Sequence, residues 1–231
     1  MIQIGGLQKT TLLDYPDKIA AAVFLIGCNF RCPFCHNPEL ADPKIKTKGL
    51  SQKKFFDFLK KRKSVLDGVC VTGGEPLINN DLVHFLQAIK ELGFLIKLDT
   101  NGYSPQRLKE VIDKGLVDYI AMDIKASPEK YAEACGIKIN IEIIMQSIKL
   151  IMKSQIVYEF RTTVIPHLHS LAEMEKIGKM IKGADIYSLQ RFNNNKTLDR
   201  TWQKQDAYNE KELADLQKVL LKYVKICQIR G

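Results

Sequence analysis

Three cysteines in one short loop are the residues of this sequence with the clearest chemistry. Cys28, Cys32 and Cys35 follow the spacing C-x3-C-x2-C, directly after an apolar run at residues 19–26. With six cysteines in 231 residues, about 0.004 such triplets are expected by chance. Three neighbouring thiolates favour a thiophilic metal centre, and a [4Fe–4S] cluster is normally held by four cysteines. A triplet would therefore leave one iron open to a small molecule.

Two other uses of clustered cysteines are less consistent with this sequence. Disulfide frameworks are typical of small secreted proteins, whereas the other three cysteines here are scattered and no signal peptide is evident. A structural zinc site needs a fourth ligand, and His36 adjoins Cys35 too closely to reach the same tetrahedral ion easily. The open-iron cluster is the preferred interpretation.

The composition indicates a globular protein in a reducing compartment. Hydrophobic residues make up 45% and charged residues 26% of the chain, and this length predicts a single domain over residues 1–231. No apolar run approaches the roughly 20 residues that a membrane helix needs, so we expect a cytoplasmic protein with no membrane partner. The net charge of +9 is spread over helix-like segments without interleaved aromatic residues. No nucleic-acid partner is therefore expected.

Six strand-like apolar runs alternate with helix-like segments. The runs cover residues 19–26, 69–72, 94–99, 117–124, 157–165 and 186–189, and the chain before residue 19 is expected to be irregular. Cap residues and apolar periodicity predict helices after Asn80, at Ser104-Pro105, at Ser127-Pro128, over 140–154 and 170–182, and from Asn209 with its capping-box partner Glu212.

This alternation predicts an α/β fold with a parallel sheet wrapped by helices. Six units are too few for a closed eight-fold barrel, and we expect a partial (βα)6 TIM-like barrel. Residues 191–208 contain no predicted strand and hold the only tryptophan, Trp202. This stretch is interpreted as a lid, a partner surface or a simple loop.

Polar residues gather where the predicted strands end. In βα folds the chemistry lies at the carboxyl ends of the strands. Here these ends carry Gly27-Cys28, Thr72-Gly73-Gly74-Glu75-Pro76, Asp99-Thr100-Asn101-Gly102, Asp123-Ile124-Lys125, Arg161-Thr162-Thr163 and Gln190-Arg191. Each motif alone is typical of a turn or an ordinary ion pair. Together, opposite three cysteines, they predict a site for a zwitterionic ligand that carries a ribose.

These motifs resemble those of the radical S-adenosylmethionine superfamily. The cysteine triplet and Gly73-Gly74-Glu75-Pro76 carry the resemblance, which runs from about residue 5 to 192. Asp14-Tyr15-Pro16, Cys32-Pro33-Phe34-Cys35-His36-Asn37-Pro38, Leu98-Asp99-Thr100-Asn101-Gly102 and Met122-Asp123-Ile124-Lys125 make the chain similar to glycyl-radical-enzyme activating proteins. The greatest similarity is to the activating proteins of anaerobic ribonucleoside-triphosphate reductases.

The resemblance implies two cofactors and a role for each candidate residue. Cys28, Cys32 and Cys35 would hold three irons of a [4Fe–4S] cluster, and S-adenosylmethionine would chelate the fourth. Gly73, Gly74 and Glu75 would face its amine, and Lys125 and Arg161 its carboxylate or ribose. Phe34 and His36 would lie against the adenine, and Asn101 would also contact the cofactor. Asp99 would bind the ribose or, with Asp123, a monovalent cation.

The resemblance further implies an activase that acts on another protein. One electron from a flavodoxin or ferredoxin would cleave S-adenosylmethionine, and the resulting radical would take hydrogen from a glycine of a glycyl radical enzyme, expected to be an anaerobic ribonucleotide reductase. This reaction requires a wide cleft bordered by Asp14, Asp99, Lys125 and Arg161. The alternatives are a small-molecule radical enzyme of tailoring or cofactor synthesis, and a non-catalytic protein with a structural metal.

Two departures from the family pattern limit the resemblance. Asp17 stands where relatives usually have a glycine, which leaves open whether Asp14 contacts the partner's peptide. No ferredoxin-like module follows the triplet, because residues 36–69 contain no cysteine. Cys70, Cys135 and Cys227 are too dispersed in the sequence to suggest a second cluster, and Cys70 is interpreted as a small core residue.

Overall fold

The computed structural model describes residues 2–42, 45 and 48–231, and its centre is one eight-stranded sheet. The strands pair in chain order, and all pairs are parallel except β1 with β2. The strands are β1 (Ile4–Thr11), β2 (Ala20–Leu25), β3 (Gly68–Gly73), β4 (Leu95–Thr100), β5 (Tyr119–Asp123), β6 (Val157–Val164), β7 (Ile186–Arg191) and β8 (Ile226–Arg230). No pairing joins β8 to β1 in the described part of the chain, so the barrel is open.

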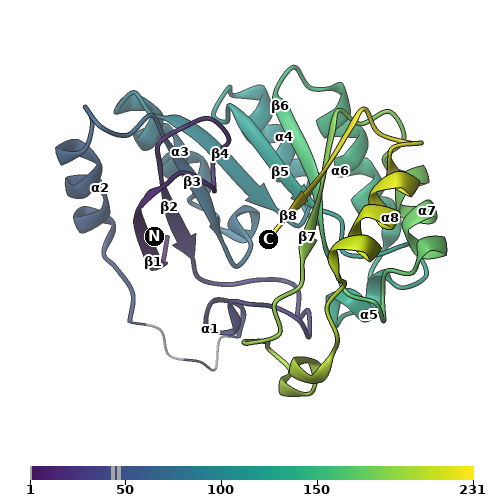
Figure 1. The fold of residues 1–231 in the computed structure, drawn as a ribbon. Helices are drawn as coiled ribbons and strands as arrows, with labels where there is room; N and C mark the ends of the chain where they lie inside the picture. The colour runs from purple at the N-terminus through teal and green to yellow at the C-terminus, as the bar shows by residue number, and fades with distance from the viewer. Residues whose placement is uncertain (1, 43–44, 46–47) are drawn as a thin grey trace.

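Helices connect the parallel strands and lie around the outside of the curved sheet (Figure 1). They are α1 (Pro38–Ala41), α2 (Gln52–Lys61), η1 (Pro76–Ile78), α3 (Leu82–Glu91), α4 (Pro105–Asp113), α5 (Tyr131–Cys135), α6 (Ile141–Lys153), α7 (Leu171–Met180), η2 (Arg200–Lys204) and α8 (Glu210–Leu220). Each longer helix buries one apolar stripe, as Phe85, Leu86 and Ile89 of α3 illustrate. The core therefore lies between the sheet and its outer helices.

The six predicted parallel strands are confirmed as β2 to β7, but two further strands were missed. Residue 1 lies outside the described residues; the predicted irregular start is wrong for residues 4–11, which form β1, and is confirmed for residues 12–18, which form bends and turns. This strand carries Gly5-Gly6 and an exposed polar stretch, so it lacks an apolar run. A side chain at Gly5 would come 2.3 Å from Leu40. Strand β8 is short and lies at the sheet edge, where Ile226 is exposed.

The helix predictions hold, with small errors at the starts. The Asn209–Glu212 capping box is present at α8. The predicted start at Asn80 is wrong, because Asp81 precedes the first residue of α3. Ser127-Pro128 opens a turn rather than the helix itself, since α5 begins at Tyr131. No helix among the described residues is long and apolar enough to cross a membrane.

The capping box of α8 gives a first testable expectation. Asn209→Ala removes the acceptor for the Glu212 backbone N–H, which lies 3.0 Å from Asn209 Oδ1. We expect the free energy of unfolding to fall by about 0.5–2 kcal/mol, measured by urea denaturation. Lys211→Ala, an exposed change in the same helix, is the control. Equal stability of the two variants would show that the cap does not stabilise α8.

Candidate active site

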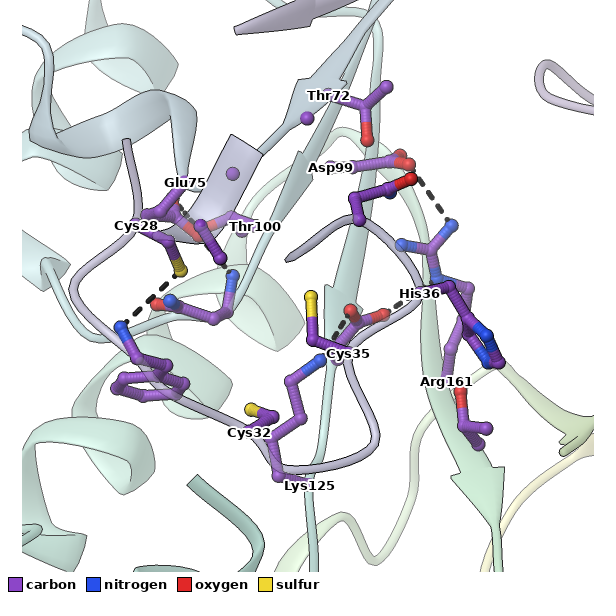
Figure 2. A pocket seen from close by; sticks show the side chains of 18 of the residues that line it. Cys28, Cys32, Cys35, His36, Thr72, Glu75, Asp99, Thr100, Lys125 and Arg161 are labelled. Atoms are coloured by element: carbon purple, nitrogen blue, oxygen red, sulfur yellow. Dashed lines mark hydrogen bonds and ion pairs between the residues drawn. The ribbon is translucent and has the colours of Figure 1, made fainter. Parts of the chain in front are cut away.

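A cavity of about 310 Å³ lies at the carboxyl ends of the strands. Its walls come from the loop after β2, the ends of β3 to β7 and residue Asp14 (Figure 2). All thirteen predicted site residues line it: Cys28, Cys32, Phe34, Cys35, His36, Gly73, Gly74, Glu75, Asp99, Asn101, Asp123, Lys125 and Arg161. The parallel sheet thus brings together residues that are up to 133 positions apart, from 28 to 161.

The cysteine loop projects its three sulfur atoms toward a common space (Figure 2). All six cysteines of the chain are free thiols. Among the described residues, no three Cys, His, Asp or Glu side chains are close enough to hold a single metal ion. The Arg31 guanidinium braces the loop by donating to the Cys28 and Phe30 carbonyls, each at 2.7 Å. The three thiols are therefore spread around a space rather than gathered on one point.

The surroundings of the three thiols differ. Burial raises the pKa of Cys28 to about 12, and the nearby Glu75 carboxylate adds to this effect. Burial also raises the pKa of Cys35. A side-chain hydrogen bond with Cys135 lowers the pKa of Cys32 and outweighs its burial. The fold thus brings Cys135, which is distant in sequence, next to the cysteine loop.

Gly73 and Gly74 let the end of β3 approach the cysteine loop closely. Gly73 has a φ of 121°, and a side chain there would come 2.2 Å from the Leu25 nitrogen. A side chain at Gly74 would come 2.0 Å from the Gly27 carbonyl oxygen. The Gly27 carbonyl accepts a hydrogen bond from the Glu75 N–H at 2.7 Å. The two glycines are therefore required by backbone packing as well as by any ligand.

Glu75 is a buried carboxylate that holds the loop after β4. One oxygen accepts from Thr100 Oγ1 at 2.8 Å and from the Leu77 N–H at 3.1 Å, and the other accepts from the Asn101 N–H at 2.6 Å. These hydrogen bonds lower the pKa of Glu75, but burial is the larger effect and raises this pKa to about 7. Both oxygens therefore already accept hydrogen bonds from the protein.

A ladder of alternating charges, which we call the charge ladder, runs along the inner face of β4, β5 and β6. It consists of Lys97, Asp99, Arg161, Asp123 and Lys125. Arg161 donates to Asp99 at 3.2 Å and to Asp123 at 2.9 Å, Lys125 donates to Asp123 at 2.9 Å, and Lys97 contacts Asp99. The register places Asp123 directly beside Arg161 on the neighbouring strand.

The charge ladder keeps its carboxylates ionised. Burial opposes ionisation, but the charges of Arg161 and Lys125 hold the pKa of Asp123 well below its usual range. The Arg161 and Lys97 charges likewise lower the pKa of Asp99 despite its burial. Since both carboxylates already have cationic partners, the expected monovalent cation beside them stays a prediction.

His169 holds the backbone at Lys125, a role that the sequence reasoning missed. The Ile165 N–H donates to His169 Nδ1 at 2.9 Å, so Nε2 carries the proton and donates to the Lys125 carbonyl at 3.0 Å. Burial lowers the pKa of His169 to about 4, which keeps this tautomer neutral. The Pro166-His167-Leu168-His169 stretch gave no spacing signal that could have distinguished His169 from its neighbour.

The sequence analysis also missed Lys97, because a lysine within an apolar strand is usually expected to face solvent. Its side chain is only 2% exposed and points, like Asp99 two residues later, to the inner face of the sheet. The available signal was the spacing: Lys97 and Asp99 are two residues apart on one strand, so their side chains lie on the same face of the sheet. The charged rim predicted from the sequence therefore lacked Lys97, which the structure pairs with Asp99.

Three comparisons with known proteins agree with this geometry. The family model of the radical SAM superfamily matches residues 23–181. A Methanocaldococcus jannaschii protein named as a glycyl-radical enzyme activating enzyme is 33% identical over 236 residues, covering 98% of this chain and 95% of that protein. The pyruvate formate-lyase-activating enzyme of Clostridium pasteurianum is 33% identical over 135 residues, covering 54% of this chain and 53% of that enzyme.

Solved structures show the same fold. SuiB of Streptococcus suis bound to S-adenosylmethionine superposes with a TM-score of 0.68 at 15% sequence identity. The match covers 89% of this chain and 48% of SuiB, so this chain spans about half the length of that protein. From the family match and the nearly full-length relative, the chain belongs to the radical SAM superfamily and, within it, to the glycyl-radical enzyme activating enzymes, which work with a [4Fe–4S] cluster and S-adenosylmethionine.

Proposed function

We propose that this enzyme cleaves S-adenosylmethionine reductively and uses the product radical to take a hydrogen atom from a glycine of a partner glycyl radical enzyme. The observation that carries the proposal is the cavity that three free thiols share with the Gly73-Gly74 turn and the charge ladder. When bound, the cluster supplies one electron that splits S-adenosylmethionine into methionine and a 5′-deoxyadenosyl radical.

The sulfur and oxygen atoms at the cavity wall suit both the [4Fe–4S] cluster and S-adenosylmethionine. Cys28, Cys32 and Cys35 offer three soft sulfur ligands around one space, which suits a cluster better than a single hard ion. Backbone carbonyls near Gly74 are assigned to the methionine amine. We assign Glu75 an indirect role in the same part of the site, because its oxygens hold Thr100 and Asn101 in place. We assign Asn101 to the same wall of the S-adenosylmethionine site.

The charge ladder supplies the groups for the carboxylate and the ribose. Lys125 and Arg161 are mostly buried cations at the cavity wall, with side chains 19% and 12% exposed. We assign them to the methionine carboxylate and the ribose oxygens, and we assign Asp99 to a ribose hydroxyl. Phe34 and His36 lie at the cavity wall and are assigned to the adenine ring.

The partner is proposed to be an anaerobic ribonucleoside-triphosphate reductase, with a flavodoxin or ferredoxin as the electron donor. Support comes from the similarity of the motifs around Asp14, Phe34, Asp99 and Asp123 to those of its activating proteins. The open barrel supports a protein substrate, because β1 and β8 are not paired among the described residues, and we assign the entry of an extended peptide to this unclosed side. Asp14 lines this cavity, and we assign it to contact with such a peptide.

Isotope transfer tests the proposed function. Reduced, reconstituted enzyme is mixed anaerobically with S-adenosylmethionine and an anaerobic ribonucleotide reductase carrying deuterated glycine. We expect a glycyl radical doublet by EPR and deuterium in 5′-deoxyadenosine. Deuterium that appears only from a small-molecule substrate would instead favour a tailoring or cofactor-synthesis enzyme.

The cysteine loop gives a second prediction. Cys→Ala at Cys28, Cys32 or Cys35 should remove one iron ligand and abolish cleavage of S-adenosylmethionine, measured by chromatography of 5′-deoxyadenosine. Cys227→Ala is the matched control, because this buried cysteine lies on β8 and is not part of the cavity wall. A Cys227 variant that lost iron as fully as the Cys32 variant would contradict the ligand assignment.

Glu75 gives a prediction on pH dependence. Its pKa is raised from 4.5 to about 7 in the folded, cofactor-free protein, so the folded state binds this proton more tightly than the unfolded state does. The resulting stabilisation is complete below pH 4.5 and is lost as the pH rises to about 7, by about 3 kcal/mol. We expect Glu75→Gln to abolish this part of the pH dependence.

The measurement is urea unfolding of both cofactor-free proteins between pH 4.5 and 7. At pH 4.5 the Glu75→Gln variant should also be less stable than the wild type, because glutamine has one acceptor oxygen and cannot serve both the Asn101 N–H and the Thr100 and Leu77 donors. An identical pH slope in both proteins would show that Glu75 does not titrate in this range.

A further inference from the structure

Residues 192–205, which follow β7, cross the outside of the cysteine loop. The Asp199 N–H donates to the Pro33 carbonyl at 2.9 Å, and His36 Nδ1 lies 3.2 Å from the Lys196 carbonyl. Lys196 Nζ forms an ion pair with Glu39 at 2.7 Å. The segment thus contacts the chain on both sides of Cys35.

Aromatic rings make the central contact between the two segments. Trp202 packs against Phe34 with 5.7 Å between ring centroids, and against His167 with 5.8 Å. Phe34 stands between Cys32 and Cys35 in sequence and is only 4% exposed. Trp202 therefore holds the residue whose backbone joins two of the three proposed iron ligands.

The segment has an ordered internal structure of its own. Asp199 caps η2 through Thr201, and Thr197 is 5% exposed and donates to the Asp199 carbonyl at 2.7 Å. Beyond the segment, the Tyr208 hydroxyl donates to the His169 carbonyl at 2.9 Å. The Tyr208 contact anchors the chain just after the segment to the loop that also positions Lys125.

We infer that residues 192–205 are the outer wall of the cluster site and that Trp202 is a positioning residue, which keeps Cys32 and Cys35 in place and restricts access to the cluster. The inference rests on the proposed function of the cysteine loop. It goes beyond that function, which assigns no role to residues 192–205. Among the three interpretations of residues 191–208, this one makes the segment part of the site.

Opening of the cysteine loop would expose a bound cluster to solvent. Chelators and oxygen reach a bound cluster when the loop moves away from the cavity, and the ring contact between Trp202 and Phe34 opposes this movement. Trp202 makes two ring contacts, one on the cysteine loop and one on the loop after β6. Its removal should increase the population of the open loop while leaving all three thiols present.

Iron release tests this inference. We expect Trp202→Ala to assemble the cluster but to lose it to a chelator about tenfold faster than the wild type, followed by absorbance near 400 nm. Trp202→Phe, which retains a ring, should lose iron at a rate close to the wild type. The matched control is Phe56→Ala on α2, which also removes two ring contacts and lies away from the cavity wall.

The native fluorescence of Trp202 provides a measurement that needs no substitution. Trp202 is the only tryptophan of the chain, so all tryptophan emission reports on this contact. Because iron–sulfur clusters absorb strongly and quench nearby fluorophores, we expect emission to fall as the cluster assembles and to recover as iron is removed.

The outcomes separate the inference from the function on which it depends. Equal iron release by wild type, Trp202→Ala and Phe56→Ala, or emission that does not respond to the cluster, would overturn the inference alone. A wild-type protein that assembles no cluster would overturn the proposed function and the inference with it. Faster iron release from Trp202→Ala alone, with restoration by Trp202→Phe, would support the inference.

Discussion

The site depends on one close backbone contact, between the end of β3 and the start of the cysteine loop. The Gly27 carbonyl accepts from the Glu75 N–H at 2.7 Å, and the Leu25 carbonyl accepts from the Gly74 N–H at 2.9 Å. This approach is possible only because residues 73 and 74 have no side chains. It brings the thiol-bearing loop beside the Glu75 turn, and Glu75 then holds the loop after β4 through Thr100 and Asn101.

Beyond this contact, parallel pairing and buried charges organise the site. Each parallel strand ends at the same rim, so polar residues at successive strand ends face one cavity. Isolated charges there would be costly to bury, and the charge ladder avoids this by alternating cations and carboxylates. The side chains of the charge ladder are thus already oriented before any ligand binds, which lowers the cost of ordering them on binding.

The carboxyl-terminal third of the chain supports residues that lie far from it in sequence. Trp202 packs on Phe34, and Tyr208 bonds the backbone of His169, which in turn holds Lys125. These contacts connect the cysteine loop, on one side of the cavity, with the end of β5 on the other side. The segment after β7 is therefore bound to the same structure that positions the cysteine loop and Lys125.

The sequence by itself determined the parts of this protein that depend on local spacing. The cysteine triplet, the Gly73-Gly74 turn and the polar strand ends are contiguous motifs, and the six inner strands are continuous apolar runs, so each could be predicted. The capping box at Asn209 was predictable for the same reason, since its two partners are three residues apart. Strands β1 and β8 were not, because edge strands carry glycine or exposed residues and acquire their conformation from the neighbour they pair with.

Tertiary structure alone decided which distant residues touch. His169, Lys97, Cys135 and Trp202 have their positions only because strands and loops separated by tens of residues are packed together. It also decided what Glu75 contacts, since a carboxylate in a turn motif gives no indication that both oxygens accept from a neighbouring loop. Hydrogen-bond partners and burial depend on long-range packing, and residue spacing along the chain does not encode them directly.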